Sequence, residues 1–259
     1  MSQVPNLNAL FQSAQADGVL SNASMQALNI VDIGAQIQAG LGTPVDDVMA
    51  SEVVLVTIMP DDSGSIRFAG NGAVVRAGHN TVLDTLAMSP QQDHILVHNR
   101  YLNGAVLYPY CPVDQAIRMD QHNYDPNLGT PLYDQTLVLL ATVLAKAQAF
   151  IDNGVPVRTV SLIITDGADA HSRRSVREVK GMVEDMLRTE DHIIAAMGIH
   201  DGQTDFKRVF REMGVRDQWI LTPGNSQHEI RKAFQLFSQS ALRASQSATS
   251  FNSLGGFGA

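Results

Sequence analysis

The stretch VVLVTIMPDDSGS, residues 53–65, decides the fold of this chain. Its first seven residues are apolar or β-branched on both faces, which is typical of a central strand buried under helices on both sides. Asp61, Asp62, Ser63 and Ser65 follow directly where that strand would end. Short carboxylate and hydroxyl side chains at the end of a buried strand indicate a binding site for a hard cation.

Two later fragments carry the same kind of oxygen donor. Gly129-Thr130-Pro131-Leu132 opens a long apolar helical segment, and Thr165-Asp166-Gly167 ends the strand-like run VSLIIT. If the two strands are neighbours in a parallel sheet, their carboxyl ends and the loop carrying Thr130 meet in one crevice. The donors suit Mg²⁺, with Mn²⁺ or Ca²⁺ as alternatives, and the lack of thiolate or imidazole among them argues against zinc or copper. The sequence therefore predicts five metal ligands: Asp61, Ser63, Ser65, Thr130 and Asp166.

Strand-like and helical segments alternate through the middle of the chain. Helical patterns cover residues 71–88, 130–152, 172–189, 205–213 and 226 onward, and strand-like runs cover 94–100, 105–111, 160–165, 192–199 and 218–222. We expect Thr130 and Ser172 to cap two of these helices and Ser226 to open the last with a capping box. Asn103-Gly104 predicts a hairpin between two of the strands. This order predicts an α/β fold with a doubly wound, mostly parallel central sheet and one antiparallel edge strand.

Composition divides the chain into three parts. Residues 1–50 are rich in Ala, Gln and Asn, and they predict a helical N-terminal extension of two helices, separated near Asp17-Gly18, the second capped by Ser21 or Asn22 and ended near Gly40. We expect this extension either to cover the main domain or to pair with another copy. Residues 51–243 form the α/β domain. Residues 244–259 predict a flexible Ser- and Gly-rich tail, with Phe251, Leu254 and Phe257 as docking anchors in the alternative.

The composition also excludes several classes of function. A chain of 259 residues, 44% of them hydrophobic, can bury a large core. Its net charge of −8 and the lack of a basic stripe argue against nucleic-acid binding. The single cysteine, Cys111, fits a reducing compartment, and neither a secretory signal nor an uninterrupted apolar span is present, so no membrane partner and a cytoplasmic location are expected.

Over residues 52–240 the pattern resembles the von Willebrand factor A (VWA) domain family. The resemblance rests on Asp61-x-Ser63-x-Ser65, on the lone Thr130 and on Thr165-Asp166-Gly167, which match the family's metal-ion-dependent adhesion site (MIDAS), and on the strand–helix order. Pro60 departs from the usual strand residue, and residues 1–50 have no counterpart in the family core. The intracellular bacterial or phage-like type of the family is the nearest in kind.

The resemblance implies a Rossmann-like fold and a magnesium ion held by the five ligands. It also implies a non-enzymatic protein–protein interaction module, in which an Asp or Glu of a partner protein completes the metal's coordination. Intracellular relatives often act beside MoxR-type AAA+ ATPases, so a subunit of a multi-protein assembly is expected. The N-terminal helices or the C-terminal tail are the segments through which self-association is expected.

A magnesium-dependent hydrolase or phosphatase using Asp61 and Asp166 is the alternative function. It is disfavoured because position 63 is Ser rather than Asp and because no lysine is placed near the crevice. A purely structural metal is a third reading. Asp62 and Asp169 are expected to be solvated charges at the rim of the site. The residues His171, Arg173 and Arg174 are expected to form an exposed helix start, with contact to a partner as the lesser possibility.

Overall fold

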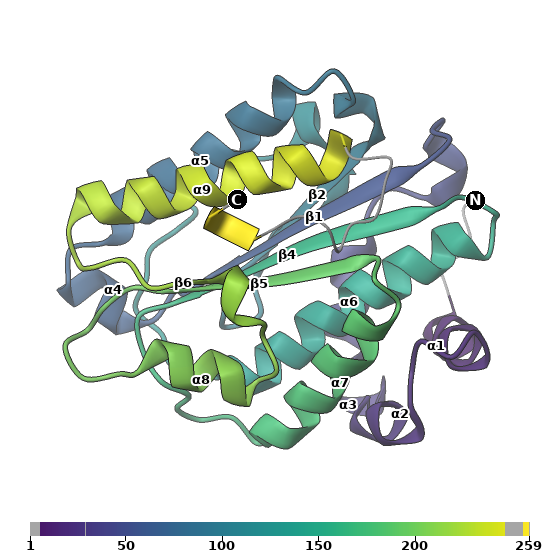
Figure 1. The fold of residues 1–259 in the computed structure, drawn as a ribbon, viewed down its shortest axis with the longest axis horizontal. Coiled ribbons are helices and arrows are strands. Elements are labelled where there is room, and N and C mark those ends of the chain that lie inside the picture. Colours follow the sequence, from purple (N-terminus) through teal and green to yellow (C-terminus); the bar gives the residue numbers. More distant parts are fainter. Residues whose placement is uncertain (1–5, 29, 247–255, 259) are drawn as a thin grey trace.

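A computed structural model describes residues 6–28, 30–246 and 256–258. Its centre is a six-stranded sheet with the order β3-β2-β1-β4-β5-β6 (Figure 1). The strands are β1 (Val53–Pro60), β2 (Ile95–Arg100), β3 (Val106–Pro112), β4 (Val157–Thr165), β5 (His192–Gly198) and β6 (Ile220–Leu221). All neighbouring pairs are parallel except β2 with β3, which confirms the predicted sheet with one antiparallel edge strand.

The strand β1 lies in the middle of the sheet, and all eight of its residues are buried. It pairs with β2 on one side and with β4 on the other, in a register that aligns Pro60 with Ile164. The two strands that carry the predicted acidic ligands are therefore direct neighbours, as their sequences indicated.

Helices cover both faces of the sheet (Figure 1). One face carries α5 (Gly72–Ala87) and α9 (Gln227–Gln246), and the other carries α6 (Leu132–Ile151) and α7 (Val176–Arg188). The short helices α4 (Gly64–Phe68) and α8 (Phe206–Glu212) follow β1 and β5. The predicted strand at 218–222 is shorter than expected, since residues 217–219 form a 3₁₀ turn and only Ile220 and Leu221 pair with β5.

The helix α6 is the one described helix that is long and apolar enough to cross a membrane by length and composition. Its mean hydropathy of 1.2 fits a helix of the protein core, because 83% of its most apolar stretch is buried inside the fold. Sixteen of its residues are buried, among them Thr136, Thr142 and Gln148. A core helix of this kind passes the same test of length and composition, so the test adds no support for a membrane span.

The N-terminal extension forms three helices rather than the two predicted. They are α1 (Leu7–Ala16), α2 (Asn22–Ala27) and α3 (Ile30–Leu41). Ser21 caps α2, as expected, by accepting a hydrogen bond from the Ser24 backbone. The helical path ends at Leu28, whose ψ of 62° is not helical, and this turn buries the Leu28 side chain, which a continuous helix would leave off the apolar face.

These three helices form an additional layer outside α6 and α7 (Figure 1). The apolar residues of α1, including Leu10 and Phe11, are buried against the rest of the chain. The extension therefore covers the main domain, and the apolar stripe of α1 is already occupied within the same molecule.

Three cationic side chains of the α/β domain donate to backbone carbonyls of this extension. Arg174 Nη1 donates to the carbonyl of Ala27 at 2.7 Å, Lys146 Nζ donates to that of Thr43, and Arg100 Nη1 reaches that of Gln36 at 3.5 Å. Ala27 is the last residue of α2, where unpaired carbonyls and the helix dipole favour a positive charge, and Thr43 lies two residues beyond the end of α3. The extension is thus held by its helix ends as well as by its apolar face.

Residues 256–258 pack against the 3₁₀ turn at residues 217–219 and against α9. Phe257 is buried and meets the ring of Trp219 edge-on, with 5.2 Å between ring centroids. Phe257 therefore acts as a docking anchor, which was the alternative to a flexible tail. Phe251 and Leu254, the other two proposed anchors, lie outside the described residues, and the helix α9 extends to Gln246, past the expected boundary at 243.

Candidate metal centre

The carboxyl ends of β1 and β4 place Asp61 and Asp166 next to each other. Asp61 follows Pro60, the last residue of β1, and Asp166 follows Thr165, the last residue of β4. Because the two strands are parallel neighbours, both carboxylates emerge at the same edge of the sheet. The convergence that the sequence predicted is therefore present in the fold.

A chain of hydrogen bonds joins four of the five predicted ligands. Asp61 Oδ1 accepts from the Ser63 backbone at 2.7 Å, and the Ser63 and Ser65 hydroxyl oxygens lie 2.9 Å apart. Ser65 in turn donates to Asp166 Oδ1 at 2.5 Å. The second oxygen of Asp61 accepts from the Thr165 hydroxyl at 2.7 Å. Carboxylate and hydroxyl oxygens from β1, β4 and the start of α4 thus form one continuous cluster.

Backbone hydrogen bonds bring the third fragment to the same place. Gly64 N donates to the carbonyl of Leu128 at 3.0 Å, and a β-bridge pairs Ser63 with Leu128. Two residues further on, the carbonyl of Thr130 accepts from Ala170 N at 2.8 Å, in the loop that follows Asp166. Thr130 is thereby held between the two ligand segments by its main chain, and its side chain is almost fully buried.

Thr130 does not cap the helix that follows it, contrary to the prediction. The helix α6 begins at Leu132, and no side chain of its N-cap residue caps it. The first amides of α6 instead donate to two side chains of the loop after β4: Tyr133 N to Asp169 Oδ1 and Ser172 Oγ, and Asp134 N to Ser172 Oγ, each at 3.1 Å. Asp169 therefore helps to cap α6, rather than being only a solvated charge at the rim of the site. Capping by the β4–α7 loop leaves the Thr130 hydroxyl without a partner among the described residues, which suits a ligand role.

Ser172 was also predicted to open the next helix, and this is wrong. The helix α7 begins at Val176 and is opened by a capping box between Ser175 and Glu178. The residues 171–174 form a loop, in which His171 takes a left-handed conformation with φ of 86°. His171 and Arg173 are exposed, as expected, whereas the Arg174 guanidinium is engaged by Ala27 and Glu178.

Asp62 is buried, which corrects the prediction that it is a solvated rim charge. Its side chain does point away from the metal edge, as strand alternation requires. It is directed instead to the β2–β3 turn, where Asp62 Oδ1 accepts from both the backbone and the side chain of Asn103, at 3.0 and 2.8 Å. Burial raises the pKa of this carboxyl, and the Asn103 bonds partly oppose that effect.

Burial also dominates the electrostatics of the two candidate ligand carboxylates. Asp61 is 0% exposed and Asp166 is 4% exposed. Burial raises the pKa of Asp61, and it raises the pKa of Asp166 to about 6, with the repulsion between the two carboxylates adding to the effect on Asp166. No Lys, Arg or His in residues 6–28, 30–246 and 256–258 forms an ion pair with either one. Two buried negative charges without a protein cation favour a bound metal ion.

The donor set fits a hard divalent cation. Two carboxylates and three hydroxyls supply oxygen only, which is the ligand chemistry of Mg²⁺, Mn²⁺ and Ca²⁺. Among the residues that the structure describes, no group of three or more His, Cys, Asp or Glu side chains is placed to hold a metal. A site at this edge therefore depends on the serine and threonine hydroxyls, and it leaves coordination positions for water or for an outside ligand.

Three supporting residues were missed by sequence reasoning. Thr165 orients Asp61, Tyr124 donates its hydroxyl to the carbonyl of Asp61, and Asn103 holds Asp62. Asn103 was recognised only as a turn residue, and nothing in the sequence near Tyr124 indicates its contact across 63 residues. The Ser175-x-x-Glu178 pattern, in contrast, was a readable capping signal for α7.

Comparison with known proteins agrees with this geometry at the level of the fold. No family model matches the sequence, and no curated protein matches it either. Among solved structures, the pilus adhesin SpaC of Lactobacillus rhamnosus GG is similar over 75% of this chain and 30% of the adhesin, with 12% identity and a TM-score of 0.55. Proximal thread matrix protein 1 from the mussel byssus, with a zinc-occupied MIDAS motif, is similar over 74% of this chain and 46% of its own, with 15% identity and a TM-score of 0.52.

The fold and the oxygen-lined edge define the class of protein to which this chain is structurally similar: doubly wound α/β domains with a polar crevice beyond the carboxyl ends of their central strands. The fold is the von Willebrand factor A fold. The chain spans less than half the length of the solved structures just named, so the likeness concerns only part of each of them.

Proposed function

We propose that this protein is a non-enzymatic interaction module that binds a partner protein through a divalent cation. In this proposal Asp61, Ser63, Ser65, Thr130 and Asp166 hold the ion, with magnesium as the physiological metal. A carboxylate of the partner's Asp or Glu completes the coordination. The buried pair Asp61 and Asp166, with which no Lys, Arg or His of the described part of the chain forms an ion pair, is the observation that carries the proposal.

The same arrangement offers little to a hydrolase. The Ser63 hydroxyl bonds to that of Ser65, and Ser65 donates to Asp166. None of the lysines that the structure describes pairs with Asp61 or Asp166. Lys146 is near the carboxyl end of α6 and bonds to Thr43, while Lys180 lies within α7, where it pairs with Glu184. General acid–base catalysis needs a positioned proton donor. The imidazole of His171 lies beside Gly129, since a Cβ added there would be 3.0 Å from His171 Nδ1, but this side chain is exposed and no hydrogen bond among the described residues orients it. Among candidate partners, a MoxR-type AAA+ ATPase is the class that the resemblance to intracellular VWA proteins implies.

Metal binding is the first test. We expect calorimetric titration of the chelator-treated protein with Mg²⁺ and Mn²⁺ to show one site. At a free metal concentration of 100 times Kd, the free energy of unfolding should rise by about 2.7 kcal/mol. The variants Ser65→Ala and Thr130→Val should weaken metal binding at least tenfold, whereas Asp93→Asn, an exposed carboxylate beside β2, should not. Equal metal affinity in all four proteins would refute the assigned ligands.

Partner binding is the second test. Purified protein should capture a partner in Mg²⁺ and lose it both in EDTA and with Ser65→Ala, and mutation of one acidic residue of that partner to its amide should abolish the interaction. Capture that is unchanged in EDTA and in Ser65→Ala would contradict a metal-bridged contact and would direct attention to the N-terminal extension.

A further inference from the structure

Two exposed apolar side chains border the candidate metal centre. Phe68, the last residue of α4, is 91% exposed, and Leu128 is 54% exposed. Of the seven large apolar side chains that the described residues expose, these two lie within three positions of a predicted ligand: Phe68 follows Ser65, and Leu128 precedes Thr130. The others are distributed elsewhere along the chain: Val31, Met49, Met88, Ile117 and Ile151.

Folding does not require an aromatic residue at position 68. The five-residue helix α4 is anchored by Ile66, which is fully buried, while Phe68 contributes almost none of its surface to the core. The ring lies beside Gly64, because a Cβ added at Gly64 would be 3.5 Å from Phe68 Cε2. The ring therefore rests against the ligand-bearing segment 63–65 while its outer surface faces solvent.

The two chain segments that carry Phe68 and Leu128 are also joined to each other. Gly64 N donates to the Leu128 carbonyl at 3.0 Å. Arg67 joins the same two segments a second time, since its Nε donates to the Pro126 carbonyl at 2.8 Å and its guanidinium pairs with Asp125. Hydrogen bonds and an ion pair thus join the segments that carry the two apolar residues, which lowers the entropic cost of binding a ligand against them.

We propose that this surface, formed by Phe68 and Leu128 beside the metal, selects a partner segment in which an acidic residue is flanked by a large aliphatic or aromatic residue. This rests on the proposed metal-dependent function and assigns the chemistry of its ligand. The cation takes the partner's carboxylate, and the adjacent apolar residue is removed from water against Phe68 and Leu128. Exposed apolar side chains beside a polar site are typical of protein-interaction surfaces, in which a few buried apolar or aromatic anchors contribute most of the binding energy.

A peptide selection tests the inference with the purified full chain. We would select a random linear peptide library on the protein in Mg²⁺ and subtract the peptides that bind in EDTA. The expected consensus contains one Asp or Glu with Leu, Ile, Phe or Trp within three residues. A consensus with the acid but without an apolar position would overturn the inference and leave the metal-dependent function intact. Failure to enrich any Mg²⁺-dependent peptide would count against the metal-bridged function itself.

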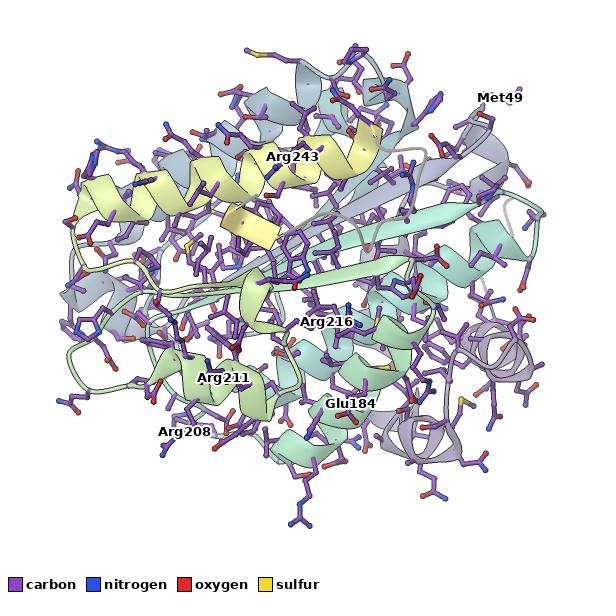
Figure 2. The ribbon with its side chains drawn as sticks, in the orientation of Figure 1. Met49, Glu184, Arg208, Arg211, Arg216 and Arg243 are labelled. Atoms are coloured by element: carbon purple, nitrogen blue, oxygen red, sulfur yellow. The ribbon has the colours of Figure 1, made fainter. Side chains whose placement is uncertain are left out.

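Single substitutions give the second arm of the test. Phe68→Ser should lower the affinity for the selected peptide by about tenfold, which is the loss expected when one partly buried aromatic side chain is removed from the interface. Its Mg²⁺ affinity, measured by calorimetry without peptide, should equal that of the wild type. Met49→Ser is the matched control: Met49 is 95% exposed and lies on the opposite side of the molecule from α4 (Figures 1 and 2). Equal peptide affinity in Phe68→Ser and Met49→Ser would overturn the proposal.

Discussion

Asp62 accepts two hydrogen bonds at one carboxylate oxygen from a single residue, Asn103, through its backbone amide at 3.0 Å and its side-chain amide at 2.8 Å. The Asn103 side chain also donates to the carbonyl of Gly129 at 2.6 Å. The β2–β3 turn is thereby tied both to the segment after β1 and to the loop that carries Thr130. Asn103 links parts of the site that are 41 and 26 residues away in sequence.

Asn103→Ala should destabilise the protein by about 2 kcal/mol, because it removes a donor from a buried carboxylate and from a backbone carbonyl. Urea unfolding in EDTA measures the free energy without a contribution from bound metal. In the Asp62→Asn background, Asn103→Ala should lower the free energy of unfolding by clearly less, because the side chain that loses its hydrogen-bond donor at position 62 is then neutral. Equal costs in the two backgrounds would contradict a direct Asp62–Asn103 interaction.

The two serines before α7 should protect different helices. Ser172→Ala should increase hydrogen exchange at the amides of Tyr133 and Asp134 at the start of α6, because Ser172 Oγ accepts from both. Ser175→Ala should instead affect the amide of Glu178 in α7, whose capping box it breaks. Each change should cost about 1 kcal/mol of stability. Faster exchange at Glu178 in Ser172→Ala would support the sequence-based assignment over the structural one.

The fold was predictable because strands and helices alternate and because β1 is apolar or β-branched on both faces. The candidate ligands were predictable for a related reason: each lies at a strand end or a helix start, and the carboxyl ends of parallel strands share one edge. These features depend on local sequence and on topology alone. The arrangement of Asp61 beside Asp166 follows from them without any detailed packing.

The errors concern contacts between segments that are distant in sequence. Strand alternation indicates that Asp62 points away from Asp61, but it cannot show that the β2–β3 turn covers that side. Ser175, with Glu178 three residues later, has the sequence pattern of a capping box, but nothing in the local sequence shows that Ser172 caps α6, because that contact depends on the placement of the β4–α7 loop over α6. The break between α2 and α3 at Leu28 likewise depends on tertiary contacts: Leu28 is buried and α2 packs against α7. The local helical periodicity of the sequence does not reveal these contacts.

Gly78 is required by the contact between α5 and α9. A Cβ at this position would lie 2.1 Å from Cδ2 of Phe234, whose ring is fully buried in the core. Gly78→Ala should therefore destabilise the protein by about 1–3 kcal/mol despite the better helix propensity of alanine. Gly181→Ala, in α7, is the control, because its Cβ would meet nothing closer than 3.8 Å, and it should be neutral or stabilising. Equal unfolding midpoints for the two variants would exclude the tight α5–α9 contact.

Lys146 should make the stability of the protein rise with pH in the alkaline range. The side chain is only 3% exposed, its ammonium lies 5.0 Å from the centroid of the Phe150 ring, and no acidic side chain in the described ranges pairs with it. Burial lowers the pKa of Lys146 from 10.5 to about 8. Between those values the unfolded chain binds more protons than the folded one, so folding gains stability as the pH increases.

The Lys146→Met variant isolates this effect, because methionine keeps the shape of the side chain and removes the charge. Between pH 7.5 and 9.5 the wild type should gain about 2 kcal/mol of unfolding free energy relative to Lys146→Met. At pH 7.5 the variant should be at least as stable as the wild type, since a buried charge without a counter-ion is replaced by an apolar group of similar volume. Lys232→Met, at an exposed position of α9, should follow the wild-type pH dependence. If Lys146→Met and the wild type show the same dependence on pH, the ammonium is solvated in the folded protein, and the contact between Lys146 and the carbonyl of Thr43 does not hold α3 in place.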